Sequence, residues 1–171
     1  MSSSDLHRRA VVLGALALPA CGFRPLYGGG TEAGPGRLLG QVRIEEDRGE
    51  LSFRLRESLI AKFRPAAPSA PLILNIEPRV ARDGLLIEDD DEITRYNLTL
   101  SVAYALRRVG APTTDPALAS GEARTVAAFN ATASQYATLV SEREVRARAA
   151  DDVADKIARR IAAAFDPAWL E

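Results

Sequence analysis

The stretch Tyr96-Asn-Leu-Thr-Leu-Ser-Val-Ala-Tyr-Ala-Leu106 alternates between large apolar side chains and small or polar ones. Successive side chains of a β-strand point to opposite faces of a sheet, so this period of two predicts a long strand and argues against a helix. Its even positions carry six apolar residues, which predict a buried face. Its odd positions, from Arg95 to Ala105, are mostly polar or small and predict a face that contacts water or another partner.

Three shorter segments predict the other strands of the sheet. Residues 41–45 alternate between apolar and polar side chains over a short span, and residues 72–80 do so over a longer one. Residues 123–129 place small side chains at the inward positions. Pro78 has no backbone N–H, so we expect its strand to lie at a sheet edge or to contain a bulge. The consecutive acids of residues 88–92 predict a solvated hairpin tip, because they lack the spaced ligands and central glycine of an EF-hand loop.

Two segments have the apolar period of amphipathic helices. The first stripe consists of Leu51, Leu55, Leu59, Ile60 and Phe63, and the second of Ala150, Val153, Ala154, Ile157, Ile161 and Phe165. Asp47 fits the N-cap of the first helix, which Pro65 ends. Ser141 and Glu144 fit a capping box at the start of the second helix, and Pro167 ends it.

The order of these segments, β-α-β-β-β-α, predicts an α+β fold. We expect a four-stranded, mostly antiparallel sheet with both helices packed on one face, because each helix must bury its apolar stripe. The opposite face of the sheet is then left to water or to a partner. Residues 40–171 are expected to form this single domain.

The N-terminus has the three parts of an export signal: the basic pair Arg8-Arg9, the apolar run of residues 10–18, and a small residue before a cut point. The apolar run is far shorter than the roughly 20 residues of a membrane-spanning helix. The stretch Leu18-Pro-Ala-Cys21 resembles a bacterial lipobox, which predicts an N-acyl diacylglycerol lipid on Cys21. Residues 1–20 are then the signal peptide, and the Gly- and Pro-rich residues 21–39 are the lipid anchor and a flexible tether.

Two other interpretations of the N-terminus remain open. One is a plain secretory signal followed by a chance cysteine, and the other is export by the twin-arginine route, which Arg8-Arg9 also permits. We favour lipidation, because the signal ends at the only cysteine of the chain.

Composition excludes several classes of chemistry. The chain has 171 residues, with 22 Lys+Arg, 23 Asp+Glu, one Cys and one His. Signal removal takes away His7 together with Arg8, Arg9 and Asp5, which changes the formal net charge from -1 to -2. Without histidine or a free thiol, the mature chain has no Cys–His or Ser–His–Asp catalysis and no histidine metal site. We expect a binding protein without enzymatic activity, cofactor, metal or nucleic-acid partner, because its charge gives no general attraction to nucleic acid.

The segment Cys21-Gly-Phe-Arg-Pro-Leu-Tyr27 resembles the opening motif of the LptE family of lipopolysaccharide (LPS) assembly lipoproteins. Thr94-Arg-Tyr-Asn-Leu98, Ser120-Gly121 and the region 136–165 match the family in the same order. This resemblance implies an outer-membrane lipoprotein, anchored in the inner leaflet by acyl chains such as palmitate and facing the periplasm. It also implies a plug inside the LptD β-barrel that assists barrel assembly and binds LPS at the last step of its transport.

Binding of LPS phosphates requires basic side chains, and arginine pairs with phosphate bidentately. Arg95 is the strongest candidate, because it starts the long strand on its polar face. The weaker candidates are Arg79, Arg82, Arg107 and Arg124. For these four, a solvated or ion-paired strand arginine is the preferred interpretation. The acids of residues 88–92 would repel phosphates beside Arg95 unless divalent cations bridge them.

Two alternatives come from other functional classes. A lipid-anchored periplasmic adaptor of another envelope transport complex would share the anchor, the tether and the small α+β domain. The other is an envelope hydrolase that uses Ser with Lys or with paired carboxylates. For the first arrangement only Lys62 and Lys156 are available, and neither has a neighbouring Ser-x-x-Lys arrangement.

We predict that Cys21→Ser blocks lipidation and releases the protein into the soluble periplasmic fraction, because the acyl chains provide the membrane anchor. Mass spectrometry of the purified protein and fractionation of the cells measure the two effects. A mutant protein that keeps the mass of the lipid would contradict the lipobox interpretation.

Overall fold

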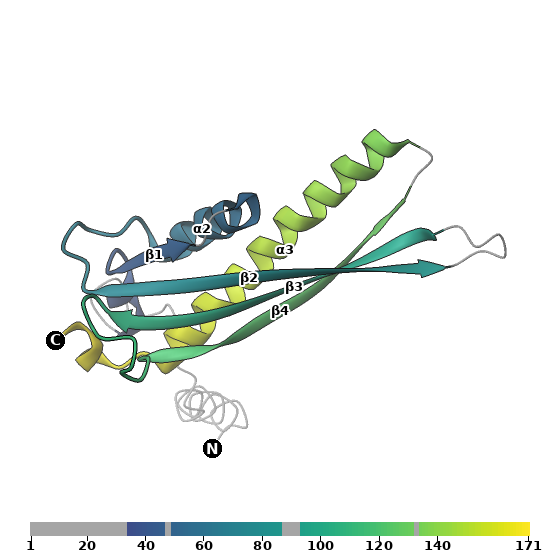
Figure 1. The fold of residues 1–171 in the computed structure, drawn as a ribbon. Helices are drawn as coiled ribbons and strands as arrows, with labels where there is room; N and C mark the ends of the chain where they lie inside the picture. Colours follow the sequence, from purple (N-terminus) through teal and green to yellow (C-terminus); the bar gives the residue numbers. More distant parts are fainter. Residues whose placement is uncertain (1–33, 47–48, 87–92, 132–133) are drawn as a thin grey trace, which may run out of the picture.

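A four-stranded sheet, in the order β1-β2-β3-β4, carries two α-helices on one face (Figure 1). The computed structural model describes residues 34–46, 49–86, 93–131 and 134–171. The elements are η2 (Gly34–Leu38), β1 (Val42–Glu46), α2 (Glu50–Phe63), β2 (Leu72–Leu86), β3 (Ile93–Arg108), β4 (Ala119–Asn130), α3 (Gln135–Ala164) and η3 (Pro167–Leu170). β1 and β2 are parallel, and the other two pairs are antiparallel. The predicted α+β fold with the order β-α-β-β-β-α is confirmed.

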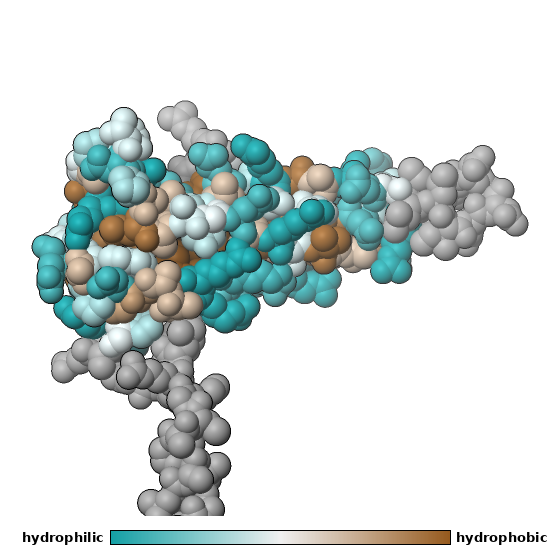
Figure 2. Space-filling model, turned by 90° about the horizontal axis from the view of Figure 1, so that it is seen from below, coloured by the Kyte–Doolittle hydropathy of each residue, from teal (hydrophilic) through white to brown (hydrophobic). Residues whose placement is uncertain are grey.

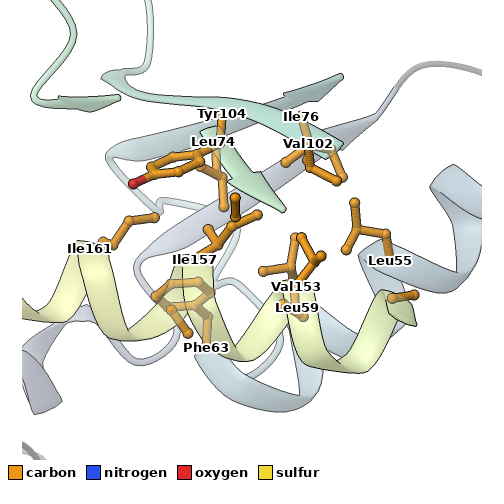
Figure 3. Close-up of a cluster of buried hydrophobic side chains, with 14 of the residues drawn as sticks. Leu55, Leu59, Phe63, Leu74, Ile76, Val102, Tyr104, Val153, Ile157 and Ile161 are labelled. Carbon is orange, nitrogen blue, oxygen red and sulfur yellow. The ribbon is translucent and has the colours of Figure 1, made fainter. Parts of the chain in front are cut away.

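The core lies between the helices and the even-numbered side chains of β2 and β3. Leu98, Leu100, Val102 and Leu106 of β3 are 0% exposed. In Figure 3, strand side chains face both helices, and those labelled are Leu74, Ile76, Val102 and Tyr104 from the strands, Leu55, Leu59 and Phe63 from α2, and Val153, Ile157 and Ile161 from α3. Burial of each large side chain contributes about 1.5–3 kcal/mol. This shared core holds both helices on one face of the sheet.

The long helix begins earlier than the sequence predicted. α3 starts directly after Ser134, whose hydroxyl accepts a hydrogen bond from the Ala137 N–H at 3.4 Å. The capping box predicted at Ser141 and Glu144 is therefore wrong, and both residues lie inside the helix. The helix continues through them because Ser134 already provides a cap, and because Glu142 is buried on the side of α3 that faces the sheet.

The cap predicted for α2 is also wrong. Gly49 is at the N-cap position of this helix and makes no side-chain hydrogen bond, whereas Asp47 lies outside the described residues. Gly49 has φ of 153°, a backbone conformation that favours glycine. The chain thus enters α2 through a glycine-dependent bend instead of through a side-chain cap.

Part of the expected tether packs against the domain. Residues 34–38 form the 3-10 turn η2, and Leu38 is 1% exposed within the core cluster. A buried leucine removes apolar surface from water and fixes this part of the chain to the domain. The earlier residues of the tether and Cys21 lie outside the described residues.

Pro78 lies in β2 where the strand has a free outer edge, as predicted. β1 pairs with β2 only as far as Ile76, and in Figure 1 β2 continues well past the end of β1. The Leu72 N–H donates to the Gln41 carbonyl on the β1 side, so even-numbered residues of β2 direct their backbone groups to this edge. The missing N–H of Pro78 therefore removes no bond to β3.

Basic side chains of α3 hold the outer edge of β4. Lys156 Nζ donates to the Arg124 carbonyl at 3.0 Å, and the Arg160 guanidinium donates to the Glu122 carbonyl. Asp152 accepts hydrogen bonds from the Thr125 hydroxyl at 2.7 Å and from Lys156 at 3.1 Å. These bonds join α3 to β4 and occupy backbone groups of an edge strand that could otherwise pair with another strand.

Asp152 gives this contact a pH dependence. The hydrogen bonds from Thr125 and Lys156 lower the pKa of Asp152 below its ordinary value of 3.8. A carboxyl whose pKa is lowered by folding stabilises the protein above its ordinary pKa, and this stabilisation is lost as the pH falls through the folded-state pKa. We predict that Asp152→Asn lessens the fall in the free energy of unfolding between about pH 5 and about pH 2. The effect is small, because the carboxylate is largely solvated.

Denaturant unfolding at a series of pH values measures this effect. Asp115→Asn is the matched control, since Asp115 lies on an exposed turn and its carboxylate forms no hydrogen bond to the described residues. Identical acid sensitivity in the wild type and Asp152→Asn would show that this contact does not contribute.

Candidate ligand-binding face

The face of the sheet that points away from α2 and α3 is the candidate ligand-binding surface. β3 contributes its odd-numbered residues to this face: Arg95, Asn97, Thr99, Ser101, Ala103, Ala105 and Arg107. Figure 2 views the molecule from below and shows hydrophilic side chains among paler ones with scattered brown patches. Both α-helices pack on the even-numbered side chains of β3, which leaves the odd-numbered face without a helix, and Thr99 in its centre is buried among its neighbours.

Two of the candidate arginines are brought together in the middle of this face. Arg79 of β2 and Arg124 of β4 both align with Ser101 of β3, one on each side. Adjacent strands are about 4.8 Å apart, so the two Cα atoms are about 10 Å apart. Both residues are exposed, and neither guanidinium forms a hydrogen bond or ion pair with any residue that the structure describes. We name Arg79, Ser101 and Arg124 the arginine row.

The surroundings of the arginine row differ on its two sides. Toward the start of β2, Glu77 and Glu122 align with Ala103 of β3. This position is two residues, or about 7 Å, from Ser101 along the strand. In the other direction, the neighbouring positions are uncharged, and Val126 among them is 55% exposed. A ligand at the arginine row meets two guanidiniums beside an exposed apolar side chain, and the next carboxylate in this direction is that of the exposed Asp83, four positions from Arg79 along β2.

Arg95 and Arg107 lie on the same face but far from the arginine row. Each is six residues from Ser101 along β3, which is about 20 Å. Arg95 is exposed at the hairpin end of the strand, beside Asn130 in the register. Arg107 is half-buried at the opposite end, and its guanidinium donates to the Asp115 carbonyl. The candidates therefore do not form one cluster.

Arg82 is on the other face, under α3. Its Nη1 lies 3.5 Å from Glu142 Oε2, and its guanidinium carbon lies 5.0 Å from the centre of the Tyr96 ring. Glu142 is only 6% exposed and also pairs with Arg146 at 2.6 Å. Tyr96 in turn stacks on Phe129 with ring centres 5.3 Å apart. Arg82 thus anchors the hairpin to α3, in accord with the ion-paired interpretation.

The sequence interpretation did not include Glu142 as an ion-pair partner. Its spacing of four residues from Arg146 was a visible helical signal, because such residues are neighbours on a helix face. The contact with Arg82 joins residues 60 positions apart and has no local signal.

The remaining predictions concern membrane and metal. Cys21 and the acidic residues 88–92 lie outside the described residues. Within the described ranges, no helix has both the length and the apolar character that are needed to cross a bilayer. The same ranges contain no group of three or more Cys, His, Asp or Glu side chains arranged to hold a metal ion.

A family model described as LptE, lipopolysaccharide-assembly, matches residues 39–161. The chain belongs to the LptE family. The match extends from β1 through the sheet and α2 to most of α3, so both faces of the sheet belong to the LptE region. The family resemblance inferred from the sequence is confirmed. No curated protein sequence matches the chain.

Several solved structures share the fold of this LptE-family chain. A protein described as a lipoprotein from Caulobacter crescentus CB15 is 21% identical with a TM-score of 0.62, and the match covers 77% of this chain and 94% of that one. Rare lipoprotein B from Shewanella oneidensis is 16% identical, with a TM-score of 0.52 and coverage of 72% and 92%. A minor lipoprotein from Acinetobacter baumannii is 16% identical, with a TM-score of 0.53 and coverage of 74% and 93%. At these identities the likeness concerns the fold.

Proposed function

We propose that this LptE-family chain is a non-enzymatic lipoprotein that occupies an LptD-type β-barrel of the outer membrane and binds LPS on its open sheet face. The family match over residues 39–161 carries the proposal. Acylated Cys21 holds the protein in the inner leaflet, facing the periplasm, and residues 21–33 link the lipid to the domain. In this role the protein assists assembly of the barrel and insertion of LPS at the cell surface.

The chemistry of the open face supports a position inside a barrel. The lumen of an outer-membrane barrel is polar, whereas its outer surface is apolar. The open face is polar as well, because its central strand contributes Asn97, Thr99 and Ser101. The hydroxyl and amide groups of such a surface can form hydrogen bonds with a polar lumen.

The arginine row supports contact with the phosphates of LPS. Guanidinium groups bind phosphate oxygens bidentately, and the guanidiniums of Arg79 and Arg124 have no partner among the described residues. The exposed Val126 beside them can contact an apolar part of the same ligand. Because the mature net charge of -2 provides no general attraction to an anionic glycolipid, binding depends on these placed contacts. Arg95 is a separate contact near the hairpin end.

Co-purification tests the barrel assignment. We expect the full chain, extracted with mild detergent, to purify as a one-to-one complex with a large outer-membrane β-barrel protein. The measurement is affinity purification followed by mass determination of the intact complex. A chain that never brings down a barrel but brings down another envelope complex would favour the adaptor alternative and contradict the plug assignment.

Charge removal on the open face tests LPS binding. We predict that the double variant Arg79→Ala/Arg124→Ala binds LPS about tenfold more weakly, which corresponds to about 1.4 kcal/mol, while barrel association is unchanged. Arg95→Ala also lowers LPS binding. The matched control is Arg64→Ala, which removes an exposed arginine at the end of α2, on the helix side of the sheet. Affinity is measured with purified protein and LPS at fixed ionic strength.

The variants also locate the site. If Arg95→Ala alone weakens binding, the phosphate site is at the hairpin end and the arginine row does not contribute. If all variants bind LPS like the wild type, the open face is not the LPS site.

A further inference from the structure

A pocket of about 190 Å³ lies on the helix side of the sheet, where the first turn of α2 approaches β2 and α3. Leu51, Val80 and Ala147 form its apolar part, with one residue from each of the three elements. Val80 is 41% exposed, although it occupies an inward position of β2. The pocket therefore exposes apolar surface that the core does not use.

The pocket is also lined by arginines whose charge is only partly neutralised. Arg54, Arg143 and Arg146 line it together with a single carboxylate, that of Glu50. Arg146 is held by the buried Glu142 at 2.6 Å. The side chains of Arg54 and Arg143 form no hydrogen bond or ion pair within the described ranges of the chain. Two guanidiniums are thus available to an anionic group beside an apolar surface.

The free edge of β2 adjoins this pocket. β1 ends its pairing at Ile76, so the outward N–H and C=O groups of Val80 and Arg82 meet no strand in the described part of the chain. An unpaired strand edge is a template on which an extended segment can add as a further strand. A strand added here alternates its side chains, and every second one points to the helix side, where the pocket lies.

We propose that this pocket and the adjoining edge of β2 bind an extended, acidic segment of a protein partner. The partner's backbone pairs with Val80 and Arg82, and its carboxylate side chains pair with Arg54 and Arg143. An apolar side chain of the same segment contacts Val80. The site lies on the opposite face from the arginine row, so it is independent of LPS binding there.

Charge and geometry favour this occupant over two others. A second copy of the chain, paired through the same edge, would bring identical arginines together, and like charges destabilise such a pair. A small phosphorylated ligand would pair with the guanidiniums but leave the backbone groups of the strand edge unused. An acidic segment in extended conformation satisfies both sets of groups.

The probe is a fluorescent peptide of about ten residues, the length of a β-strand, that alternates Glu and Val. We expect it to bind the full chain in mild detergent, with an affinity that decreases as salt increases. A peptide that alternates Lys and Val should not bind. In the complex, hydrogen exchange at the amides of Val80 and Arg82 should slow, because these amides become hydrogen-bonded.

Three variants complete the test. Arg54→Glu/Arg143→Glu should weaken peptide binding at least about tenfold, equal to about 1.4 kcal/mol. Val80→Pro should weaken it as well, since it removes an outward N–H without removing a bond to β3. Arg159→Glu, far along α3 on an exposed position, is the matched charge control and should bind like the wild type.

Two results would overturn the proposal. One is equal peptide affinity in the wild type and the double charge variant, including the absence of binding by both. The other is weaker binding by the charge variant with no change of hydrogen exchange at Val80 and Arg82, which would make the pocket a simple anion site. If Val80→Pro fails to fold, the charge variant and the exchange measurement still decide the question.

Discussion

The alternation of apolar and polar side chains in β3 determines the register of the whole sheet. β3 pairs with β2 on one side and β4 on the other, so its buried even positions determine the register of both neighbours. A slip of one residue would move every apolar side chain to the open face and remove the core. The same register places Arg79 and Arg124 beside Ser101 on the open face, and Arg82 beside Leu98 on the helix face. The alternation of side chains along β3 therefore determines both the packing of the core and the positions of the arginines on the open face.

Most of the fold could be predicted from the sequence because its signals are local. The period of two in β3 and the apolar stripes of both helices depend only on neighbouring residues, and all three elements were confirmed. Helix starts were less predictable. Ser141 and Glu144 have the spacing of a capping box, but the helix begins after Ser134, because the burial of Glu142 against the sheet extends it. That burial depends on Arg82, which is 60 positions away in the sequence.

The candidate site was less predictable than the fold. Arg79 and Arg82 are three positions apart in one strand, and this odd spacing already puts them on opposite faces of the sheet. The pairing of Arg79 with Arg124 has no such local signal, because it requires the registers of β2 on β3 and of β3 on β4 together. The pocket beside Val80 likewise requires the packing of α2 and α3. Sequence patterns supply candidate residues, and tertiary pairing decides which of them act together.

Beyond the first turn of α2, apolar packing gives way to a polar and aromatic cluster. Val80 is 41% exposed there, and Arg82 takes the next inward position of β2. The hairpin is held instead by Glu142, which forms ion pairs with Arg82 of β2 and with Arg146 of its own helix. The Tyr96 ring lies against the Arg82 guanidinium in a cation–π contact. A buried carboxylate is tolerated only with such partners. Ion pairs and cation–π contacts depend on position more strongly than apolar contacts do, so this cluster fixes the hairpin against α3 without covering the sheet. The far half of the sheet can therefore keep its register while its outer face and the edge of β2 stay open to partners.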